Sequence, residues 1–486
     1  MSVTEADIVG LIIVLEAELW PALVATDSDC GQHVPLPHGR MLGGTSAMNG
    51  MAFIANSRAN VDTWGALGNE GWNWATFSPY YRKISLTLSS EEKIKELGLE
   101  YVDPKLNGID GPLQALGLGY PMSSDPFSGD GLGGYTNAAA IDPARSFSAN
   151  AYYLPAKGHP NLHVVSEALG DTEFTVKALR EVIISVGIFN SPKVLELSGI
   201  GSLDTLEKFN TPVVVDNPNV GENLQDHPLP GVIFEVQVFI NTKDNLMRNY
   251  SSTLLPLSDF SKPDTGSEDL ATILAATVPD SSSADFAAFI RSILQNPREA
   301  TGGYFTYPAR RNSKGSSFPE NYITICSFLL YPLSRGICHV SSADPAKPPI
   351  VDPRYLSHPA DLEMSARHTR FIDAIASSQP LACMLKPGGK RSPGVPDDLR
   401  TASLDEVKDY VKSAGRSTYH ATSTCAMLPR EEGGVVDSRL RVWGTKGLRV
   451  VDASVIPIAP KANPQTMVYA LAERAVDLIK EDLAGK

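Results

Sequence analysis

Two polar side chains in the last seventy residues, those of His420 and Asn463, are of types that serve in proton transfer and substrate positioning. An imidazole titrates at about pH 6.5, so it can accept a proton from a hydroxyl group at physiological pH. An asparagine amide can hydrogen-bond a substrate oxygen and fix its orientation. Most histidines are structural, however, and Asn463 followed by Pro464 also fits the cap of a helix. Residue types alone leave both readings open.

A glycine-rich stretch near the start, "PHGRMLGGTSAMNGMAF" (37–53), is the second feature with chemical meaning. Gly43, Gly44 and Gly50 allow tight turns and a close approach of the backbone to another group. The alternative is a glycine-rich turn that packs only against protein.

Several functional classes are disfavoured by the sequence. A formal net charge of −13 without long basic runs argues against nucleic-acid binding. The sequence contains no G-x-S-x-G motif, which argues against a serine hydrolase. The wide spacing of the cysteines gives no zinc pattern and indicates mostly buried thiols; they are Cys30, Cys326, Cys338, Cys383 and Cys425. No metal site is therefore expected.

The apolar run 8–15 is too short to span a bilayer, which takes about 20 residues. It follows acidic residues and not a basic region, so it does not resemble a secretory signal. We therefore expect no transmembrane segment and a cytoplasmic location.

The pattern of apolar residues predicts the strands and helices that position these residues. The segments 178–187 and 447–457 have continuous apolar centres, as in buried parallel strands. Short alternating segments between 230 and 350 indicate an antiparallel sheet with helices. Helices are expected at 191–202 with Ser191 as the cap, after Asn73, at 361–378 and at 463–483. A short strand is expected at 161–165.

Three long motifs, in order, resemble those of the glucose–methanol–choline (GMC) family of FAD-dependent alcohol oxidoreductases. The first is "GRMLGGTSAMNGMAF" with "WGALGNEGWNW" (39–74). The second is "EVIISVGIFNSPKVLELSGIG" (181–201), followed by "VGENLQDHP" (220–228). The third runs from "STYHATSTCAM" (417–427) to "NPQTMVYALAE" (463–473). The resemblance extends over most of residues 37–483.

The resemblance implies an α/β (α+β) fold with two domains. A discontinuous Rossmann-like FAD-binding domain, trimmed near its N-terminus, would comprise residues 1–225 and 416–486. A substrate-binding domain with an antiparallel sheet and helices would comprise 226–415. The implied reaction is oxidation of a small-molecule alcohol, by an oxidase or a dehydrogenase, with a place in secondary metabolism. A base takes the hydroxyl proton while a hydride passes from carbon to the flavin. The oligomeric state is not readable.

By the same resemblance, His420 is the catalytic base and Asn463 positions the substrate oxygen. Cofactor contacts are implied for Gly43, Gly44, Ser46, Asn49, Gly50, Met51, Ala52, Asp452, Ala453, Pro464 and Gln465. Pro464 and Gln465 would open the last helix, whose N-terminus offers N–H groups to the flavin. His227 is expected to be structural.

The chain departs from the family at "DIVGLIIVLEAE" (7–18). In the family a G-x-G-x-x-G turn and a helix separate two strands, and they bind the pyrophosphate. Here the two strand ends are joined directly, which adjacent parallel strands do not allow. We therefore expect weakened or lost FAD binding. Ser423 replaces a usual glycine, and Val186 and Ile188 replace small residues.

Two alternatives to FAD-dependent oxidation stay open. His420 and Asn463 could support proton transfers alone, as in a flavin-independent dehydratase, cyclase or isomerase. The chain could also be a truncated, non-catalytic family member.

Overall fold

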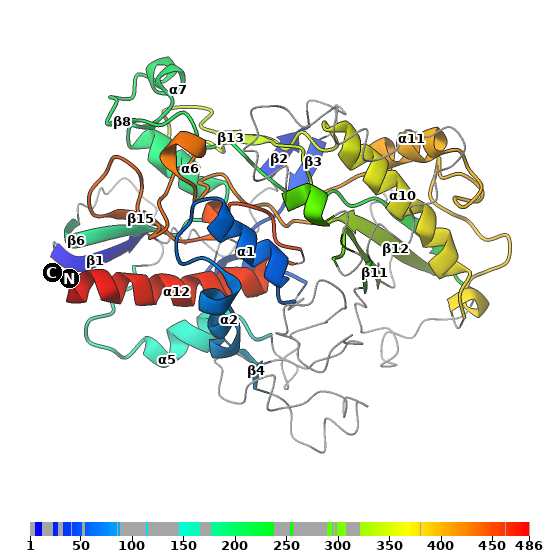
Figure 1. Ribbon diagram of the computed structural model, residues 1–486, viewed down its shortest axis with the longest axis horizontal. Helices are drawn as coiled ribbons and strands as arrows, with labels where there is room; N and C mark the ends of the chain where they lie inside the picture. The colour runs from blue at the N-terminus through cyan, green and yellow to red at the C-terminus, as the bar shows by residue number, and fades with distance from the viewer. Residues whose placement is uncertain are drawn as a thin grey trace.

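The computed structural model describes most of the chain in sixteen ranges. The described residues are 5–11, 23–27, 33–39, 41–50, 54–84, 86–87, 113–114, 145–165, 176–237, 253–255, 289–293, 296, 299–307, 321–379, 381–461 and 463–485. Both chain termini lie at one end of the molecule (Figure 1). Among the described residues, no helix combines the length and the apolar character that a membrane span requires.

A three-stranded parallel sheet forms one end of the molecule. Its strands are β1 (Glu5–Leu11), β6 (Lys177–Ile184) and β15 (Leu448–Val450), in the order β1-β6-β15. Leu11 and Val450 both align with Ile184, so the three strands end together. The parallel strands expected at 178–187 and 447–457 are confirmed, but the second is limited to Leu448–Val450 and is followed by the short helix η7 (Ala453–Val455). The part of the "DIVGLIIVLEAE" stretch beyond Leu11 lies outside the described residues.

Helix α12 (Gln465–Ala484) begins in the middle of the molecule and runs toward the end that holds this sheet (Figure 1). It packs against α2 (Trp74–Lys83), which follows α1 (Arg58–Ala66). Asn73 caps α2 through the backbone N–H of Thr76 in a capping box, which confirms the expected cap. Trp64, Trp72 and other aromatic residues of this region are fully buried in the largest apolar cluster.

A four-stranded antiparallel sheet forms the other end. Its order is β10 (Thr253–Leu255), β11 (Gly302–Tyr307), β12 (Tyr322–Leu329) and β9 (Gly231–Glu235). All residues of β12 are buried. The expected antiparallel sheet is thereby confirmed.

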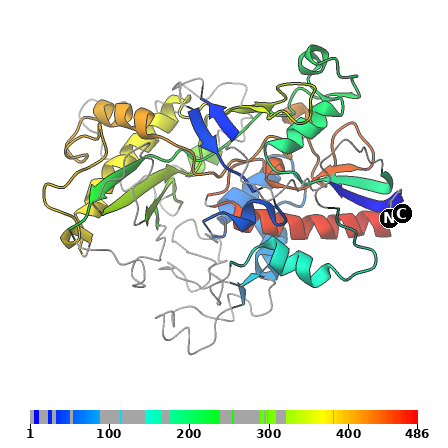
Figure 2. The same ribbon diagram turned by 180° about the vertical axis from the view of Figure 1, so that it is seen from behind.

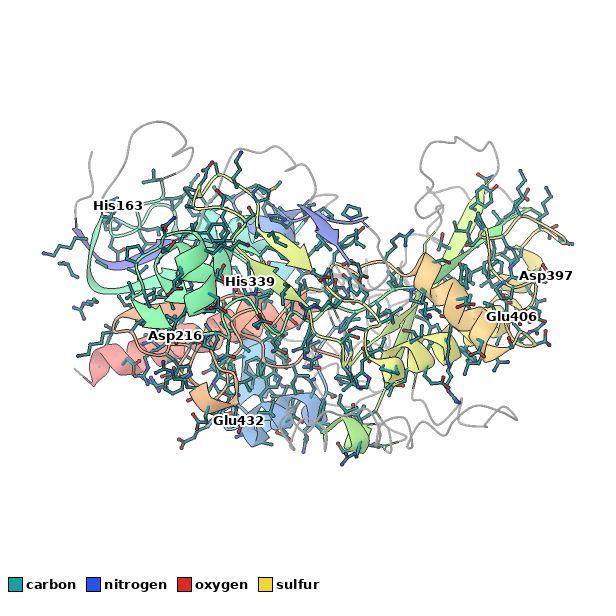
Figure 3. All side chains as sticks on the ribbon, turned by 90° about the horizontal axis from the view of Figure 1, so that it is seen from above. His163, Asp216, His339, Asp397, Glu406 and Glu432 are labelled. Atoms are coloured by element: carbon teal, nitrogen blue, oxygen red, sulfur yellow. The ribbon has the colours of Figure 1, made fainter. Side chains whose placement is uncertain are left out.

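Two helices cover this sheet. Helix α10 (Pro359–Ala376) packs on β12 and against α11 (Leu404–Ala414), and the reverse view shows the same layering (Figure 2). The helix expected at 361–378 is thus confirmed. Seen from above, Asp397 and Glu406 lie at this end, and Asp216 and Glu432 lie toward the other (Figure 3).

The remaining described elements are short. The short strands are β2 (Leu23–Thr26), β3 (His33–Leu36), β4 (Leu86–Thr87), β5 (Leu113–Gln114), β7 (Ile200–Gly201), β8 (Val215–Asp216), β13 (Ile337–His339) and β14 (Ile350–Asp352). The short helices are η1 (Gly44–Ala47), η2 (Ala149–Tyr153), α5 (Leu154–Ala156), α6 (Asn190–Leu197), α7 (Leu203–Lys208), η5 (Leu381–Cys383), η6 (Arg430–Glu432) and η7 (Ala453–Val455). The domain boundaries at 225/226 and 415/416 stay a prediction.

Two local expectations are wrong. Residues 161–165 form no strand. Helix α6 begins at Asn190 with Phe189 in the N-cap position, so Ser191 lies inside the first turn and is not the cap. The Ser191 hydroxyl donates instead to Asp452 Oδ2 at 2.5 Å. A tertiary partner has here replaced the local backbone partner that the sequence pattern indicates.

Candidate active site

His420 is held at three points by residues from distant parts of the chain. Its backbone N–H donates to Asp226 Oδ1 at 3.0 Å. Its Nδ1 lies 3.0 Å from Nδ1 of His227, and its Nε2 lies 2.8 Å from the amide nitrogen of Asn463. The imidazole is buried. Backbone and ring contacts together fix both its position and its rotation.

Asp226 connects the segments around this imidazole. Oδ1 accepts the backbone N–H of His227 at 2.8 Å as well as that of His420. Oδ2 accepts the hydroxyls of Tyr355 and Ser417, each at 2.5 Å. Burial raises the pKa of this carboxyl group, and the four hydrogen bonds oppose that rise. The carboxyl group thus joins three chain segments at one buried point.

Both imidazoles of the pair are neutral near pH 7. Burial lowers the pKa of His227 to about 4 and holds that of His420 well below its usual value, and the charge of His227 lowers the latter further. The rings meet edge to face at 88° with centroids 5.2 Å apart. A neutral imidazole retains the lone pair that a proton acceptor needs.

An aromatic wall lies against the pair. The ring of Phe328, from β12, lies 6.2 Å from the ring of His420 and 5.9 Å from that of His227. The antiparallel sheet thus supplies the apolar side of the site. Such a wall keeps water from the imidazoles and strengthens electrostatic interactions within the site.

Asn463 and the start of α12 form the other side. Pro464 occupies the N-cap position of α12 and makes no side-chain capping bond, so Asn463 is not the cap. The Asn463 amide contacts His420 instead. Gln465 Oε1 accepts a hydrogen bond from the Asn49 amide at 2.9 Å. The helix start is thereby tied to the glycine-rich segment.

The glycine-rich segment contains left-handed backbone positions and two glycines that face open space. Gly43 and Gly44 have φ of +92° and +52°. A Cβ at Gly43 would lie 2.6 Å from the ring of Phe147, whereas Gly44 and Gly50 face open space. Ser46 donates to the carbonyl of Gly43 at 2.5 Å. Met51 and Ala52 lie outside the described residues.

Arg145 anchors this segment from the side. Its guanidinium donates to Asn49 Oδ1 at 2.9 Å and to the Ser46 carbonyl at 3.3 Å. Burial lowers the pKa of Arg145 from its ordinary value. The contacts run from Arg145 through Asn49 to Gln465 at the start of α12.

Asp452 and Ala453 follow β15, at the carboxyl ends of the parallel strands. Asp452 accepts the backbone N–H groups of Gly187 and Ser454 at 2.9 and 2.8 Å, besides the Ser191 hydroxyl. The carbonyl of Ala453 accepts the Ser423 N–H at 3.3 Å. Asp452 therefore fixes the loops at the strand ends, where open α/β sheets bind ligands.

The three departures from the family pattern have definite places. Ser423 is buried with φ of +82°, a conformation that glycine adopts without strain. Val186 packs against the largest apolar cluster, and Ile188 packs against a separate cluster beside Phe189. Gly187 between them has φ of +85°.

The described residues fit the ring end of a flavin. The first turn of α12 has no side-chain cap, so its N–H groups are available to ring oxygens. The open faces of Gly44 and Gly50 allow a flat ring to approach the backbone closely. Among the described residues, no group of three His, Cys, Asp or Glu side chains could hold a metal ion.

Sequence reasoning missed His227 and Asp226. Both lie in the "VGENLQDHP" motif. Their adjacency in the sequence does not reveal that Asp226 accepts the His420 backbone N–H or that His227 contacts the His420 ring. The motif marked the segment as important. It did not show that His227 and His420, which are 193 positions apart, make contact.

The sequence matches two protein-family models, both described as GMC oxidoreductase. The N-terminal model matches residues 22–171 and 164–229, and the C-terminal model matches 332–472. Dehydrogenase mpl7 of Monascus purpureus is 32% identical, over 92% of this chain and 84% of its own length. Patulin synthase of Penicillium expansum is 30% identical, over 90% and 77%.

Solved structures match the fold over nearly the whole chain. An FAD-dependent oxidoreductase from Chaetomium thermophilum superposes with a TM-score of 0.81 at 24% identity, covering 99% of this chain and 94% of its own. A fungal aryl-alcohol oxidase superposes with a TM-score of 0.77 at 23% identity and the same coverage. At these identities the likeness shows the fold.

Proposed function

Because the chain belongs to the GMC family of FAD-dependent oxidoreductases, we propose that it oxidises the CH–OH group of a small-molecule alcohol. The observation that carries this proposal is the contact between His420 Nε2 and the amide of Asn463. A neutral imidazole nitrogen and an amide lie side by side there, so a hydroxyl group that enters between them can meet both a proton acceptor and a hydrogen-bond donor. A place in secondary metabolism stays a prediction.

In this proposal His420 is the general base. The amide nitrogen of Asn463 can only donate, so Nε2 of His420 carries the lone pair. A substrate hydroxyl that takes the place of the Asn463 N–H at this lone pair gives its proton to Nε2, and the released Asn463 N–H then donates to the substrate oxygen. FAD, when bound, supplies the acceptor for the hydride that leaves the alcohol carbon with its electron pair. The alcohol becomes an aldehyde or a ketone.

Burial affects both halves of the proton transfer at His420, because it keeps the ring unprotonated and also makes it a weaker base than a free imidazole. Its lowered pKa keeps the base neutral and ready to accept a proton. The same lowered pKa makes the protonated ring a good proton donor, so the proton returns readily to water after turnover. Phe328 keeps water from the imidazole during the reaction.

The residues proposed to hold the flavin come from both ends of the chain. They are Gly43, Gly44, Ser46, Asn49, Gly50, Met51, Ala52, Asp452, Ala453, Pro464 and Gln465. The start of α12 would face the ring oxygens, and the glycine backbone would lie along the ring. Asp452 would act by fixing Gly187 and the first turn of α6 at Ser191, and not by direct charge contact, because its oxygens already accept three donors.

The test is reduction of the flavin by alcohols in the absence of oxygen. The protein is loaded with FAD, mixed with primary, secondary and benzylic alcohols, and followed by its visible flavin absorbance. We expect bleaching with at least one alcohol, slowed by about 10²–10⁴-fold in His420→Gln. His163→Gln is the matched control, because His163 is exposed (Figure 3) and should react at the wild-type rate.

Two outcomes would overturn the proposal. One is flavin reduction in His420→Gln at the rate of His163→Gln. The other is turnover of a substrate by flavin-free protein that His420→Gln abolishes, which would instead support a dehydratase, cyclase or isomerase.

A further inference from the structure

His227 and His420 form a buried pair whose Nδ1 atoms face one another. The two atoms are 3.0 Å apart, a distance at which one must donate a hydrogen and the other must accept it. Both rings are buried, and burial keeps both neutral near pH 7. Each neutral ring carries one proton on one of its two nitrogens.

The contact of Asn463 decides where these protons lie. The amide nitrogen of Asn463 donates to Nε2 of His420, so the proton of His420 must sit on Nδ1. That proton points to Nδ1 of His227, which must therefore carry a lone pair. The proton of His227 is then on Nε2, a buried nitrogen that has no hydrogen-bond partner of ordinary geometry among the described residues and interacts only electrostatically with the backbone carbonyls of Leu330 and Pro460.

We infer that His227 is a positioning residue that fixes the tautomer of His420, and so keeps the lone pair of Nε2 directed at the substrate hydroxyl. This inference rests on the proposed function, in which His420 is the base. His227 does not touch the reacting atoms. It accepts the Nδ1–H of His420 and thereby excludes the tautomer that carries its proton on Nε2, which cannot accept another.

No other described side chain near the pair offers this acceptor to the ring. Asp226 accepts the backbone N–H groups of both histidines, and its second oxygen is occupied by Tyr355 and Ser417. Phe328 presents an apolar ring to both imidazoles. Loss of His227 would leave the Nδ1–H of His420 buried without an acceptor, and the proton would move to Nε2 while the Asn463 amide turns over to offer its oxygen in place of its nitrogen.

Three substitutions of His227 distinguish the effect of its hydrogen-bond acceptor from the effect of its side-chain volume. Asparagine places its amide oxygen near the position of the histidine Nδ1, so His227→Asn should preserve the acceptor. Glutamine places its oxygen one carbon further along the side chain, so His227→Gln has similar polarity but a displaced acceptor. His227→Leu removes the acceptor and retains the apolar volume.

The direct readout is ¹⁵N NMR of histidine-labelled protein, with the His420 signals identified by their loss in His420→Gln. In the wild type and in His227→Asn we expect a protonated Nδ1 and an unprotonated Nε2. In His227→Gln and His227→Leu we expect the proton to move to Nε2. This measurement needs no substrate, so it stands even if alcohol oxidation fails.

The kinetic readout is flavin reduction with an alcohol that the wild type oxidises. The maximal reduction rate should fall about 10²-fold in His227→Gln and His227→Leu, because the base is lost from most molecules. The rate of His227→Asn should stay within about threefold of the wild type, and the alcohol affinity of all three should change little.

The inference is overturned if the maximal rate of flavin reduction falls by the same factor in all three variants. It is also overturned if the tautomer of His420 is unchanged in His227→Leu and His227→Gln. If His227→Leu does not fold, the asparagine and glutamine variants still decide. Loss of activity in His420→Gln together with equal activity in all His227 variants would refute only this inference and leave the proposed function in place.

Discussion

The amide nitrogen of Asn463 lies 2.8 Å from Nε2 of His420 and joins the residue before the first turn of α12 to the loop that carries the candidate base. The same amide does not cap the helix, because α12 begins after Pro464 without a side-chain cap. The contact therefore has a chemical use that helix formation does not require.

Replacing Asn463 with aspartate should change the pH dependence of flavin reduction. A carboxylate beside Nε2 would favour the protonated imidazole, so the pH below which activity is lost should rise by about one to three pH units. Asn463→Ala removes the donor without adding charge and should lower the rate with no such upward shift. Rate profiles against pH for the two variants check this, and coincident profiles would contradict it.

Removing the Asp226 carboxylate should strongly destabilise the fold. In Asp226→Ala the buried backbone N–H groups of His227 and His420 lose their acceptor. Four donors are affected, so we expect a loss of about 3–5 kcal/mol in the free energy of unfolding. Asp226→Asn keeps one oxygen for the two N–H groups and should lose about half as much. Urea unfolding of both variants measures the difference, and a loss below about 1 kcal/mol in Asp226→Ala would be inconsistent with this role.

His339 should make stability depend on pH on the alkaline side. Burial alone would lower its pKa, but the hydrogen bonds and charges of Glu196 and Glu222, 2.7 and 3.1 Å away, raise it to about 9. Because the folded pKa exceeds the unfolded value of about 6.5, this stabilisation is complete below about pH 6.5 and is lost as the pH rises through 9. The full effect is about 3 kcal/mol.

Unfolding by urea at a series of pH values tests this contribution. In His339→Gln the free energy of unfolding should fall less steeply between about pH 6.5 and 9 than in the wild type. The His339 side chain is only 18% exposed, whereas His163 is exposed (Figure 3), so His163→Gln should retain the wild-type decline of stability with pH. An equal decline in both variants would assign the effect to other groups.

Ser423 carries backbone strain that a glycine would relieve. A φ of +82° destabilises the fold by about 1–2 kcal/mol at a residue with a Cβ. Glycine avoids this strain, but its greater conformational freedom in the unfolded chain lowers the free energy of unfolding by about 0.4–1 kcal/mol. Both Ser423→Gly and Ser423→Ala lose the hydrogen bond to Thr422, so their comparison isolates the backbone. The glycine variant should be more stable than the alanine variant by about 0.5–1 kcal/mol. Thermal unfolding of the two proteins measures this, and an alanine variant at least as stable would contradict the strain.

The sequence by itself determined the features that depend on local patterns. Continuous apolar runs predicted the parallel strands β6 and β15, and periodicity predicted α10, because burial of one face repeats with the geometry of the element. Asn73 caps α2 as expected because both partners of the capping box lie within three residues. The family motifs also marked His420 and Asn463.

Only the tertiary structure decided which partners those residues have. Ser191 and Asn463 have the local chemistry of caps, yet Asp452 and His420 engage them from 261 and 43 positions away. The pairing of His227 with His420 likewise depends on how two separate loops meet at Asp226. Local propensity is worth about 1 kcal/mol, and buried polar groups that need partners outweigh it. The sequence therefore specified the elements and the catalytic candidate, while long-range packing specified its proton partner.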